Sequence, residues 1–579
     1  MELIQLTING RKVEVETGTT ILEAAKKLNI EIPTLCHLKL QDGKHVSCTS
    51  SCRVCSVEVE GKKNLVAACS TPVAPYMVVK TNTQKVANAR KTLVELLLSD
   101  HPQDCLKCQK NLKCELQKIA SDLNIRQIRY EGERTKTPTD FSSVSITRDV
   151  DKCILCRRCV SVCNNIQTIG VLSPVFRGFE TIISTAFMEP LAETNCTNCG
   201  QCVAVCPTGA LRETNDEDRV WDALDDEDKY VIVQTAPAIR AALGEQFGLK
   251  PGTNVTGKMV SVLKALGFKK VYDTDFAADL TIMEEANELV NRIKNNKDLP
   301  LLTSCCPGWI KFLEHNYGEF LNLPSSCKSP QQMFGAIAKS YLAEKLGVDP
   351  KKMVVVSIMP CTAKKFEASR KEMEVDGIRD VDIVLTTREL SSMIRSAGLD
   401  LNDFEDDDFD NPLGESTGAA VIFGNSGGVM EAALRTAYEL ITDQKLEKID
   451  FQAVRGLDGI KSATIKIGDL DLKIAVASGL GNARKLMESI KNGENQYAAI
   501  EIMACPGGCI DGGGQPFIRG DREILKKRTA VLYNVDEGKD IRKSHESPII
   551  KEIYNKYLIE ANGEKAHKLL HTHYKNRHS

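Results

Sequence analysis

The 22 cysteines of this 579-residue chain are the residues most able to do chemistry. They cluster at short gaps, a spacing that suits metal ligation better than disulfide bonds. In TSCCPGW, residues 303–309, two of them stand side by side after an apolar run. Consecutive side chains of an extended segment point to opposite sides. One of Cys305 and Cys306 can therefore reach a metal while the other faces elsewhere.

An internal repeat carries the most specific motif. CILCRRCVSVC (residues 153–163) and CTNCGQCVAVC (residues 196–206) both follow the pattern C-x2-C-x2-C-x3-C. In bacterial ferredoxins with two clusters, the fourth cysteine of each run binds the other cluster. The repeat therefore predicts two [4Fe–4S] sites. The expected ligands are Cys153, Cys156, Cys159 and Cys206 for the first site, and Cys163, Cys196, Cys199 and Cys202 for the second.

The N-terminal segment contains CRVCSVEVEG (residues 52–61), and with this motif it resembles the plant-type ferredoxin domain of redox-complex subunits. Alternating apolar residues over 3–15 predict a β-hairpin, and residues 21–30 predict a short amphipathic helix. The motif CRVCSVEVEG (residues 52–61) carries the resemblance, which implies a [2Fe–2S] cluster with Cys48 as a bystander. The ligands expected there are Cys36, Cys52, Cys55 and Cys69.

A further motif, HPQDCLKCQKNLKC (residues 101–114), has one histidine and three cysteines at H-x3-C-x2-C-x5-C spacing. Zinc bound by three cysteines and one histidine is the physical competitor. The neighbouring ferredoxin repeat favours a [4Fe–4S] cluster instead. The surrounding residues 81–140 are expected to be helical. The ligands of this cluster would be His101, Cys105, Cys108 and Cys114.

Beyond about residue 216, apolar runs alternate with helical patterns, which predicts an α/β fold. The runs VIVQTAPA, LPLLTSCCPG, MVVVSIMPC and YAAIEIMACPGGC have the continuous apolar character of strands in a buried parallel sheet. Open α/β sheets bind ligands beyond the carboxyl ends of their strands. One deep metal site that collects thiols from three strand ends is therefore expected. The cysteines at these ends are Cys305, Cys306, Cys361, Cys505 and Cys509.

Three segments, TSCCPGW, MPCTAKKFE and MACPGGCIDGGGQP, resemble the signature segments of [FeFe]-hydrogenases, in their order along the chain. In the tail, RKSHESPIIKEIYNKYL and KAHKLLHTHY resemble the C-terminal segment of that family. The resemblance implies an H-cluster, a [4Fe–4S] cubane linked to a di-iron unit that carries CO, cyanide and azadithiolate. Cys509 would bridge the cubane to the di-iron unit. The cubane ligands would be Cys306, Cys361, Cys505 and Cys509.

The same resemblance implies the surroundings of the di-iron unit. Lys364 and the backbone near Ala236 and Pro237 would bond the cyanides. The side chains expected to line the pocket or to lie beside it are Met359, Met503, Phe423, Ser329 and Gln331.

Hydrogen chemistry also needs a path for protons. A thiol with a pKa near 8.5 is mostly protonated at neutral pH, so an unligated cysteine at the site can relay protons, and Cys305 has that position. Glu285 and Glu288 lie at i,i+3 on one predicted helical face, with Arg292 four residues further on. The relay that the family resemblance implies runs, from the site to solvent, through Cys305, Glu285, Ser325, Glu288 and Arg292.

These features predict a multidomain α/β and α+β protein in which Cys48, Cys305 and Cys327 are the cysteines left free of iron, Cys327 as a core residue. The expected units are a β-grasp [2Fe–2S] domain over 1–80, a helical His/Cys3 cluster domain over 81–140, a bacterial-ferredoxin-like domain with two [4Fe–4S] clusters over 141–215, a two-lobed α/β H-cluster domain with parallel sheets over 216–515, and a C-terminal helical segment over 516–579 packed on the catalytic domain.

Composition sets the broad class of protein. The net charge is −3 and 42% of residues are hydrophobic, so nothing favours nucleic acid or a membrane surface as a partner. Apolar stretches stay short of the ~18 residues of a membrane helix, and the start MELIQLTING lacks a secretory pattern. We therefore expect a cytoplasmic protein. A solvated C-terminal tail is expected to hold His567, His571, His573 and His578.

The family resemblance implies the reversible reduction of protons to H2, with ferredoxin as an electron partner. The form TLCHLKL…SCRVCSVEVEG is similar to the subunit of NAD(P)-linked, electron-bifurcating hydrogenases. Flavin- and NAD(P)-binding subunits and iron–sulfur subunits would then complete a hetero-oligomer. A single-subunit ferredoxin hydrogenase is the alternative. An iron–sulfur assembly protein and an H2 sensor are rivals from other classes, against which Cys305 and Lys364 argue.

Overall fold

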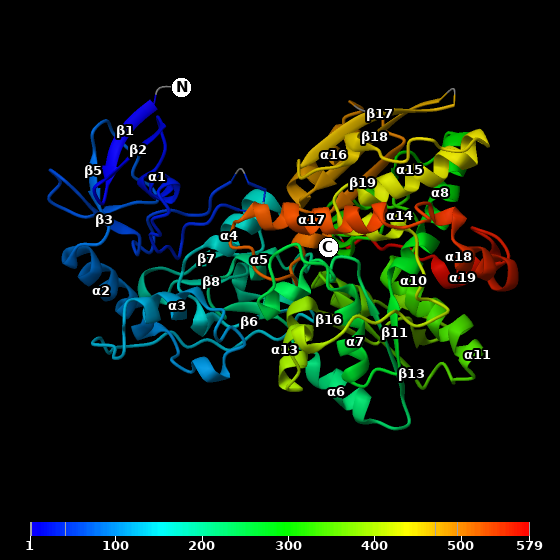
Figure 1. Ribbon diagram of the computed structural model, residues 1–579, viewed down its shortest axis with the longest axis horizontal. Helices are drawn as coiled ribbons and strands as arrows, with labels where there is room; N and C mark the ends of the chain where they lie inside the picture. The colour runs from blue at the N-terminus through cyan, green and yellow to red at the C-terminus, as the bar shows by residue number, and fades with distance from the viewer. Residues whose placement is uncertain (1–2, 41, 44, 469, 495, 578–579) are drawn as a thin grey trace.

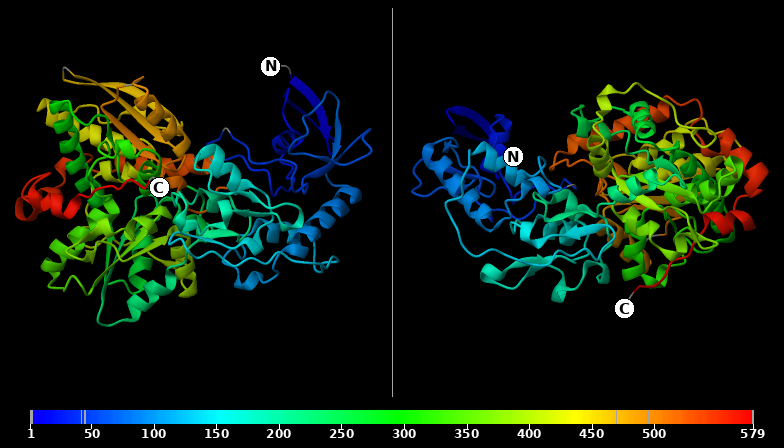
Figure 2. Two further views of the ribbon diagram at one scale, coloured as in Figure 1. Left: turned by 180° about the vertical axis from the view of Figure 1, so that it is seen from behind. Right: turned by 90° about the horizontal axis from the view of Figure 1, so that it is seen from below.

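The computed structural model describes residues 3–577 except residues 41, 44, 469 and 495. The molecule is elongated, with the N-terminal units at one end and the C-terminal half forming the bulk at the other (Figures 1 and 2). Among the described residues, the helices lack the combination of length and apolar character that is needed to cross a bilayer. The predicted multidomain architecture of α/β and α+β units is confirmed.

The N-terminal unit is a mixed five-stranded sheet with one helix packed on it, in the strand order β2-β1-β5-β3-β4. β1 and β2 form the predicted hairpin, with Leu6 opposite Val13, while β1 and β5 are parallel. α1 begins after Thr20, whose side chain forms a capping box with Glu23. The elements are β1 (Leu3–Ile8), β2 (Arg11–Glu16), α1 (Ile21–Lys27), β3 (Ser56–Val59), β4 (Val66–Ala67) and β5 (Val78–Lys80).

The next region, residues 81–140, is helical only as far as residue 122. It contains α2 (Gln84–Asp100) and α3 (Glu115–Asp122), but residues 123–140 form neither helix nor strand. The expectation of helix over 81–140 is therefore wrong for its last part. The segment RQIRYEGERTKTPTD (126–140) has few apolar residues and contains a glycine and a proline. It consequently lacks an apolar face that a helix could bury against a core.

The ferredoxin-like unit lies between the N-terminal units and the C-terminal half (Figure 1). β6 pairs with β9 and β7 with β8, both antiparallel. Each predicted cysteine run contains one short helix, α4 in the first run and α5 in the second. The elements are β6 (Ile146–Arg148), α4 (Arg158–Ser161), β7 (Ser173–Val175), β8 (Ile182–Ser184), α5 (Gln201–Val205) and β9 (Leu211–Glu213).

Two four-stranded sheets build the C-terminal half. The first has the order β11-β10-β13-β16 and is parallel throughout. The second has the order β12-β19-β18-β17, in which only the β17–β18 hairpin is antiparallel. The four predicted apolar strands are β10, β12, β13 and β19. The strands are β10 (Tyr230–Thr235), β11 (Lys270–Asp273), β12 (Leu301–Leu302), β13 (Met353–Met359), β16 (Ile383–Thr386), β17 (Ile460–Ile467), β18 (Leu470–Ser478) and β19 (Ala499–Met503), with a small pair β14 (Glu374–Val375) and β15 (Ile378–Arg379) beside them.

Helices surround these sheets, and the long helix α8 (Asp275–Asn295) packs against α10, α14 and α15. Most of α8 is buried, including the carboxylates of Glu284 and Glu285. The remaining helices of this half are α6 (Glu217–Asp225), α7 (Thr256–Ala265), α9 (Pro307–Asn316), α10 (Pro330–Ile337), α11 (Ala343–Leu346), α12 (Ala363–Ala368), α13 (Thr387–Ser396), α14 (Gly418–Val421), α15 (Gly428–Thr442) and α16 (Leu480–Lys491).

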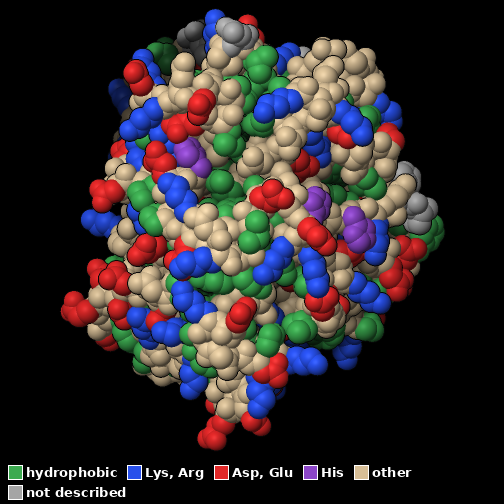
Figure 3. Space-filling model, turned by 90° about the vertical axis from the view of Figure 1, so that its right-hand side faces the viewer, with side chains coloured by type: hydrophobic (Ala, Val, Ile, Leu, Met, Phe, Trp, Pro, Cys, Tyr) green, Lys and Arg blue, Asp and Glu red, His purple; other side chains and the backbone are tan. Residues whose placement is uncertain are grey.

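The C-terminal segment packs on the catalytic half through α17 (Arg522–Glu537), α18 (Pro548–Ile553) and α19 (Glu564–Leu570). Figure 3 shows this side of the molecule, where acidic and basic side chains are interspersed. His571 is only 8% exposed, and its ring bonds Glu284 at 3.0 Å and Ser326 at 2.8 Å. The ring of His567 stacks on it.

The expectation of a solvated histidine tail is therefore wrong for His571, whereas His567 is exposed although its ring stacks on that of His571. The buried carboxylate of Glu284 needs hydrogen-bond donors, and the tail supplies them from His571, Tyr554 and the Asn562 amide. His573 is exposed, and His578 lies outside the described residues.

Candidate active site

The three strand ends predicted to supply thiols do meet. β12 and β19 belong to one sheet and β13 to the other, and the segments after them border a common cavity with about 740 Å³ of space. The Ala504 amide donates to the Cys306 sulfur at 3.3 Å, which ties two of these segments together. The cysteines that line the cavity are Cys305, Cys306, Cys361, Cys505 and Cys509.

Most side chains expected around the di-iron unit also line this cavity. They are Ala236, Pro237, Gln331, Met359, Lys364, Phe423 and Met503. Ser329 is not among the lining residues, and its hydroxyl donates instead to Glu367 at 2.8 Å. Sequence reasoning missed Gly508, which lines the cavity with a φ of 82°. A Cβ there would lie 2.7 Å from the Ser426 nitrogen, so only glycine permits this approach of two backbones.

Glu367 is a buried carboxylate that sequence reasoning also missed. Its Oε2 accepts hydrogen bonds from Lys364 at 3.0 Å, Ser329 at 2.8 Å and Gln331 at 3.1 Å. Burial opposes the charge of Lys364, but Glu367 outweighs it and raises the pKa of that ammonium. The Lys364 Nζ also donates to the Cys305 carbonyl at 3.0 Å. The i,i+3 spacing of Lys364 and Glu367 in MPCTAKKFE is the signal that could have revealed the pair.

The thiols around this cavity fit the cubane of an H-cluster. All of them are free of disulfide bonds, and burial raises the pKa of each thiol, so an isolated thiolate would be unfavourable there. Iron stabilises thiolates, and four thiols around one cavity suit an iron–sulfur cluster. Together with the space open to solvent at its mouth, the cavity is also larger than the two ferredoxin cavities, at about 740 Å³ against 450 and 440 Å³. It therefore has room for a group larger than a cubane alone.

The carboxylates of the predicted relay lie in line beside the cavity. Glu285 is 2% exposed, and burial followed by the charge of Glu288 raises its pKa to about 8. Ser304 donates to Glu285 at 3.4 Å, and Ser325 also contacts this carboxyl. Ser325 donates to Glu288 at 2.7 Å, and Arg292 donates to the other oxygen of Glu288 at 2.6 Å. A chain of polar contacts therefore leads from Glu285 to Arg292.

Cys305 stands between this chain and the cavity. It lines the cavity with the other cysteines, and its thiol interacts with the charge of Glu285. Burial, followed by Glu285, raises the pKa of the Cys305 thiol well above its usual value. The thiol is thus held in its protonated form at neutral pH.

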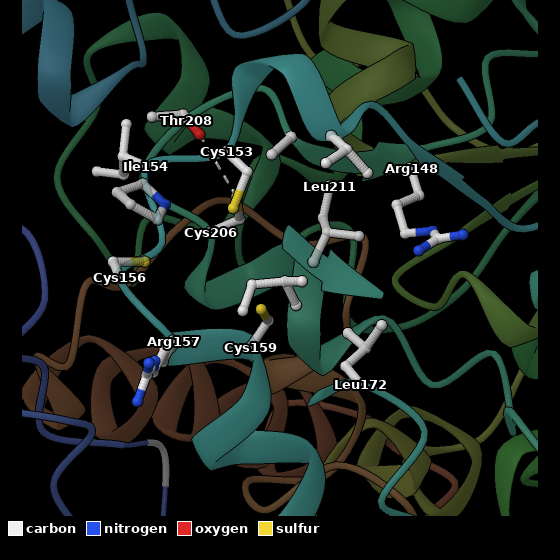
Figure 4. A pocket seen from close by; sticks show the side chains of 14 residues that line it. Arg148, Cys153, Ile154, Cys156, Arg157, Cys159, Leu172, Cys206, Thr208 and Leu211 are labelled. Carbon is white, nitrogen blue, oxygen red and sulfur yellow. Dashed lines mark hydrogen bonds between the residues drawn. The ribbon is translucent and has the colours of Figure 1, made fainter. Parts of the chain in front are cut away.

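The ferredoxin-like unit brings its eight cysteines together as two sets. Figure 4 shows the first cavity, with the side chains of Cys153, Cys156, Cys159 and Cys206 around it. The second cavity is lined by Cys163, Cys196, Cys199 and Cys202. Each set combines three cysteines of one run with the fourth cysteine of the other, which is the exchange that the repeat predicts.

In the N-terminal unit, Cys36 contacts both Cys52 and Cys69, and Cys55 contacts Cys69. Cys48 does not join this group in the described structure and instead receives a 3.9 Å contact from the Ser161 hydroxyl. These four thiols fit a [2Fe–2S] cluster by number and proximity.

The His/Cys3 motif is less closely assembled. His101 is 9% exposed, and its Nδ1 is buried without a hydrogen-bond partner among the described residues. Cys108 and Cys114 interact with each other, and Cys105 is half-buried. A buried ring nitrogen without a partner beside cysteines fits a metal ligand.

The second ferredoxin cavity lies directly against the catalytic loops. A Cβ on Gly513 would meet the Cys199 carbonyl and the Gly200 Cα, each at 2.6 Å. The Thr362 hydroxyl, next to Cys361, donates to the Asn198 carbonyl at 2.7 Å. The sequence between Cys199 and Cys202 is thus in backbone contact with the loops that carry the catalytic thiols.

Family models match the chain along most of its length. A model described as the iron only hydrogenase large subunit, C-terminal domain, matches residues 229–513, and the iron hydrogenase small subunit matches 522–577. Upstream, a 2Fe-2S iron-sulfur cluster binding domain matches 1–84 and a 4Fe-4S dicluster domain matches 152–210. The NADH-ubiquinone oxidoreductase-G iron-sulfur binding region matches 90–129.

Two curated relatives match almost the whole chain, and a third matches two thirds of it. The NADP-reducing hydrogenase subunit HndD of Solidesulfovibrio fructosivorans is 57% identical, over 99% of this chain and 99% of its own. Iron hydrogenase 1 of Clostridium pasteurianum is 43% identical, over 98% and 99%. Protein NAR1 of Arabidopsis thaliana is 33% identical, over 67% of this chain and 86% of its own.

Solved structures match the C-terminal half. The [FeFe]-hydrogenase HydA(deltaEFG) is 46% identical, with a TM-score of 0.56, over 62% of this chain and 99% of its own. An apo form of the [FeFe]-hydrogenase HydA1 from Chlamydomonas reinhardtii is 45% identical, with the same TM-score and coverage. The chain thus belongs to the [FeFe]-hydrogenases, iron-only oxidoreductases, and joins [2Fe–2S] and [4Fe–4S] domains to an H-cluster domain.

Proposed function

We propose that this chain catalyses 2H⁺ + 2e⁻ ⇌ H2 as the H2-activating subunit of a cytoplasmic, NAD(P)-linked and electron-bifurcating hydrogenase. The observation that carries the proposal is the cavity in which Cys305 and Lys364 face four further thiols from three strand ends. A relay of buried polar groups starts beside it. One side of the site thus supplies thiols for iron, and the other supplies groups that carry protons.

The H-cluster, when bound, would supply the iron at which H2 forms or splits and would pass on the electrons that the accessory clusters deliver. Cys305 holds a proton at Sγ beside the cavity, and Glu285 exchanges that proton with Ser325 and Glu288. Arg292 bonds Glu288 near the surface, at a side-chain exposure of 13%. Lys364, held by Glu367, would bond the cyanides of the H-cluster, and Met359, Met503 and Phe423 would exclude water.

The accessory clusters would conduct electrons to this site. In the domain division predicted from the sequence, each unit upstream of the catalytic domain would hold its own cluster or clusters. The [2Fe–2S] and His/Cys3 clusters would lie farthest from the catalytic loops. The ferredoxin-like unit then bridges to the cavity through the contact of Gly513 with Cys199. The proposed ligands are the four thiols of the N-terminal unit, His101 with its three cysteines, the eight thiols of the ferredoxin-like unit, and Cys306, Cys361, Cys505 and Cys509.

The multimeric assignment is supported by the likeness to a protein named as an NADP-reducing hydrogenase subunit, which extends over 99% of both chains. Such a subunit would receive electrons from flavin- and NAD(P)-binding partner subunits and from ferredoxin. A single-subunit ferredoxin hydrogenase is the second candidate, because iron hydrogenase 1 of Clostridium pasteurianum matches over 99% of its length.

The decisive experiment is an anaerobic assay of the isolated chain after maturation with the di-iron unit. Reduced viologen, reduced ferredoxin and NADPH would be offered separately as electron donors. We expect H2 from viologen and none from NADPH until flavin-containing partner subunits are added. Absence of H2 with every donor, despite a di-iron unit confirmed by infrared spectroscopy, would refute the hydrogenase proposal. Full activity with ferredoxin and no copurifying flavoprotein would instead support the single-subunit enzyme.

A further inference from the structure

Two buried lysines beside the ferredoxin-like unit have no carboxylate partner. Lys110 is 7% exposed and Lys311 is 5% exposed. Each ammonium lies over an aromatic ring, at 3.3 Å from the centroid of Phe517 for Lys110 and 4.3 Å from that of Phe366 for Lys311. Within the part of the chain that the structure describes, neither ammonium forms a hydrogen bond or an ion pair.

A buried cation without an anion is unfavourable, because it loses hydration without gaining a charge of opposite sign. A phenyl face offsets part of this loss but carries no net charge. Other buried lysines of this chain do have carboxylates, as in the 2.7 Å pair of Lys328 with Asp380 and the 2.8 Å pair of Lys365 with Glu389. Carboxylates lie near both lysines, Glu213 and Glu115 for Lys110 and Glu314 for Lys311, but none of them forms an ion pair with either ammonium among the described residues. An anion closer to each ammonium would therefore stabilise it.

Each of the two lysines comes from a segment that packs against one cysteine run of the ferredoxin-like unit. On α9, one turn before Lys311, a Cβ on Gly308 would lie 3.7 Å from both the Cys199 Cβ and the Thr197 carbonyl oxygen. The favourable charge interactions of Lys110 include one with Cys206, and those of Lys311 include one with Cys196. Cys206 lines the first cavity and Cys196 the second. The Cβ of Lys110 also lies 3.6 Å from the position of a Cβ on Gly209, three residues after Cys206.

Neither lysine belongs to the ferredoxin-like unit itself. Lys110 comes from the loop of the His/Cys3 motif, between Cys108 and Cys114. Lys311 lies on α9, the helix that begins directly after Cys306. Each ferredoxin site thus receives one cation from the neighbouring unit along the chain of clusters.

We propose that Lys110 and Lys311 are the charge partners of the two ferredoxin clusters and that each raises the reduction potential of its own cluster. The inference rests on the cluster ligands given under the proposed function. A [4Fe–4S] cluster with four thiolates is an anion, and reduction by one electron from a neighbouring cluster adds one negative charge. A fixed cation in a buried setting stabilises the reduced form more than the oxidised form.

The test is a redox titration of the full-length, cluster-loaded chain, followed by electron paramagnetic resonance. In K110M and K311M the charge is removed while an unbranched side chain remains over the phenyl ring. We expect one signal in each variant to become harder to reduce, a different signal for each lysine. A tenfold loss in the one-electron equilibrium, on the order expected for one removed charge, corresponds to 59 mV.

K110R and K311R should retain the midpoint potentials of the wild-type chain, because they retain the charge. The control is K118M, which alters a 53%-exposed lysine that pairs with Asp122 on α3 and should move no signal. Unchanged midpoints in K110M and K311M with intact signals would overturn the proposal, as would the same signal moving in both variants.

Failure to load a cluster is also informative. K110Q and K311Q provide a second neutral variant of each lysine. If the methionine and glutamine variants of one lysine both lose a cluster and its arginine variant does not, charge pairing is supported. Loss in the arginine variant as well contradicts it. A wild-type chain that lacks two [4Fe–4S] signals from the ferredoxin-like unit would refute the ligand assignment instead, so the two failures are distinguishable.

Discussion

The hydroxyl of Ser325 donates a 2.7 Å hydrogen bond to Glu288, one helical turn along α8 from the buried Glu285. The same hydroxyl contacts the carboxyl of Glu285. One serine from a loop therefore joins two carboxylates that their own helix holds one turn apart. This arrangement determines how the site is expected to respond to pH.

H2 evolution by the wild-type enzyme should decline as the pH rises through about 8. Burial raises the pKa of Glu285 to that value, so the carboxyl can donate a proton below it and loses the proton above it. E285Q should reduce the rate by roughly 100-fold or more, the usual loss on removal of a general acid or base. The measurement is H2 production from reduced viologen between pH 6 and pH 10. The neighbouring change E284Q is the control and should preserve the pH profile.

The stability of the protein should also depend on pH through the ionisation of Glu285. The pKa of Glu285 is raised on folding, so its contribution to stability is complete below the unfolded value and is lost as the pH rises through about 8. E285Q removes this loss. Wild type and E285Q should therefore differ most in thermal stability at pH 9, where E285Q should be the more stable. A wild type that is equally stable at pH 6 and pH 9 would contradict the burial of the charge.

C305A and C306A should have different effects although the two residues are adjacent. C305A should abolish turnover and leave the iron content unchanged, because this thiol is assigned to protons. C306A should lose iron, because this thiol is assigned to the cubane. Iron and sulfide analysis beside the viologen assay distinguishes the two, and loss of the cubane in C305A would mean that the roles are reversed.

E367Q should weaken the binding of the di-iron unit. Lys364 then loses its carboxylate partner in a buried setting, and breaking such a pair costs about 3–5 kcal/mol. The expected result is incomplete loading of the di-iron unit and shifted cyanide bands in the infrared spectrum. E372Q is the matched control, since Glu372 is a buried carboxylate that pairs with Lys575 and does not line the cavity.

G513A should separate the ferredoxin-like unit from the catalytic loops. A Cβ there would lie 2.6 Å from the Cys199 carbonyl, so the two backbones must move apart. Electron transfer to the catalytic site should slow, which rapid-mixing optical spectroscopy of cluster oxidation can measure. G132A adds a methyl group that meets no atom within 4 Å and should leave the rate unchanged.

H571A should loosen the C-terminal tail. The change removes one donor to the buried Glu284 and the bond to Ser326, and the loss of such a buried bond costs about 1–3 kcal/mol. Hydrogen exchange over residues 564–577 should become faster, whereas H573A alters an exposed ring and should not affect it.

Motifs with short spacing were predictable because their members are fixed by local geometry. The ferredoxin runs, the N-terminal hairpin and the apolar strands before Cys306, Cys361 and Cys505 all depend on residues within one element or one loop. Of the two errors, one has a local cause and the other a long-range one. A polar stretch after α3 was assigned to helix without an apolar face, and His571 was assigned to solvent because its partner Glu284 lies 287 positions away.

By itself, the sequence determined the family, the cluster motifs and the positions of the thiols along the chain, because cysteine spacing limits which thiols can share a cluster. Only the tertiary structure decided that Glu367 holds Ser329, that Gly513 lies against Cys199, and that the segments carrying Lys110 and Lys311 pack against the ferredoxin-like unit. Most of these contacts join elements that are distant in the chain. Because these residues are far apart in the sequence, no fixed spacing between them could indicate the contact. Burial and charge pair them only after the units have packed.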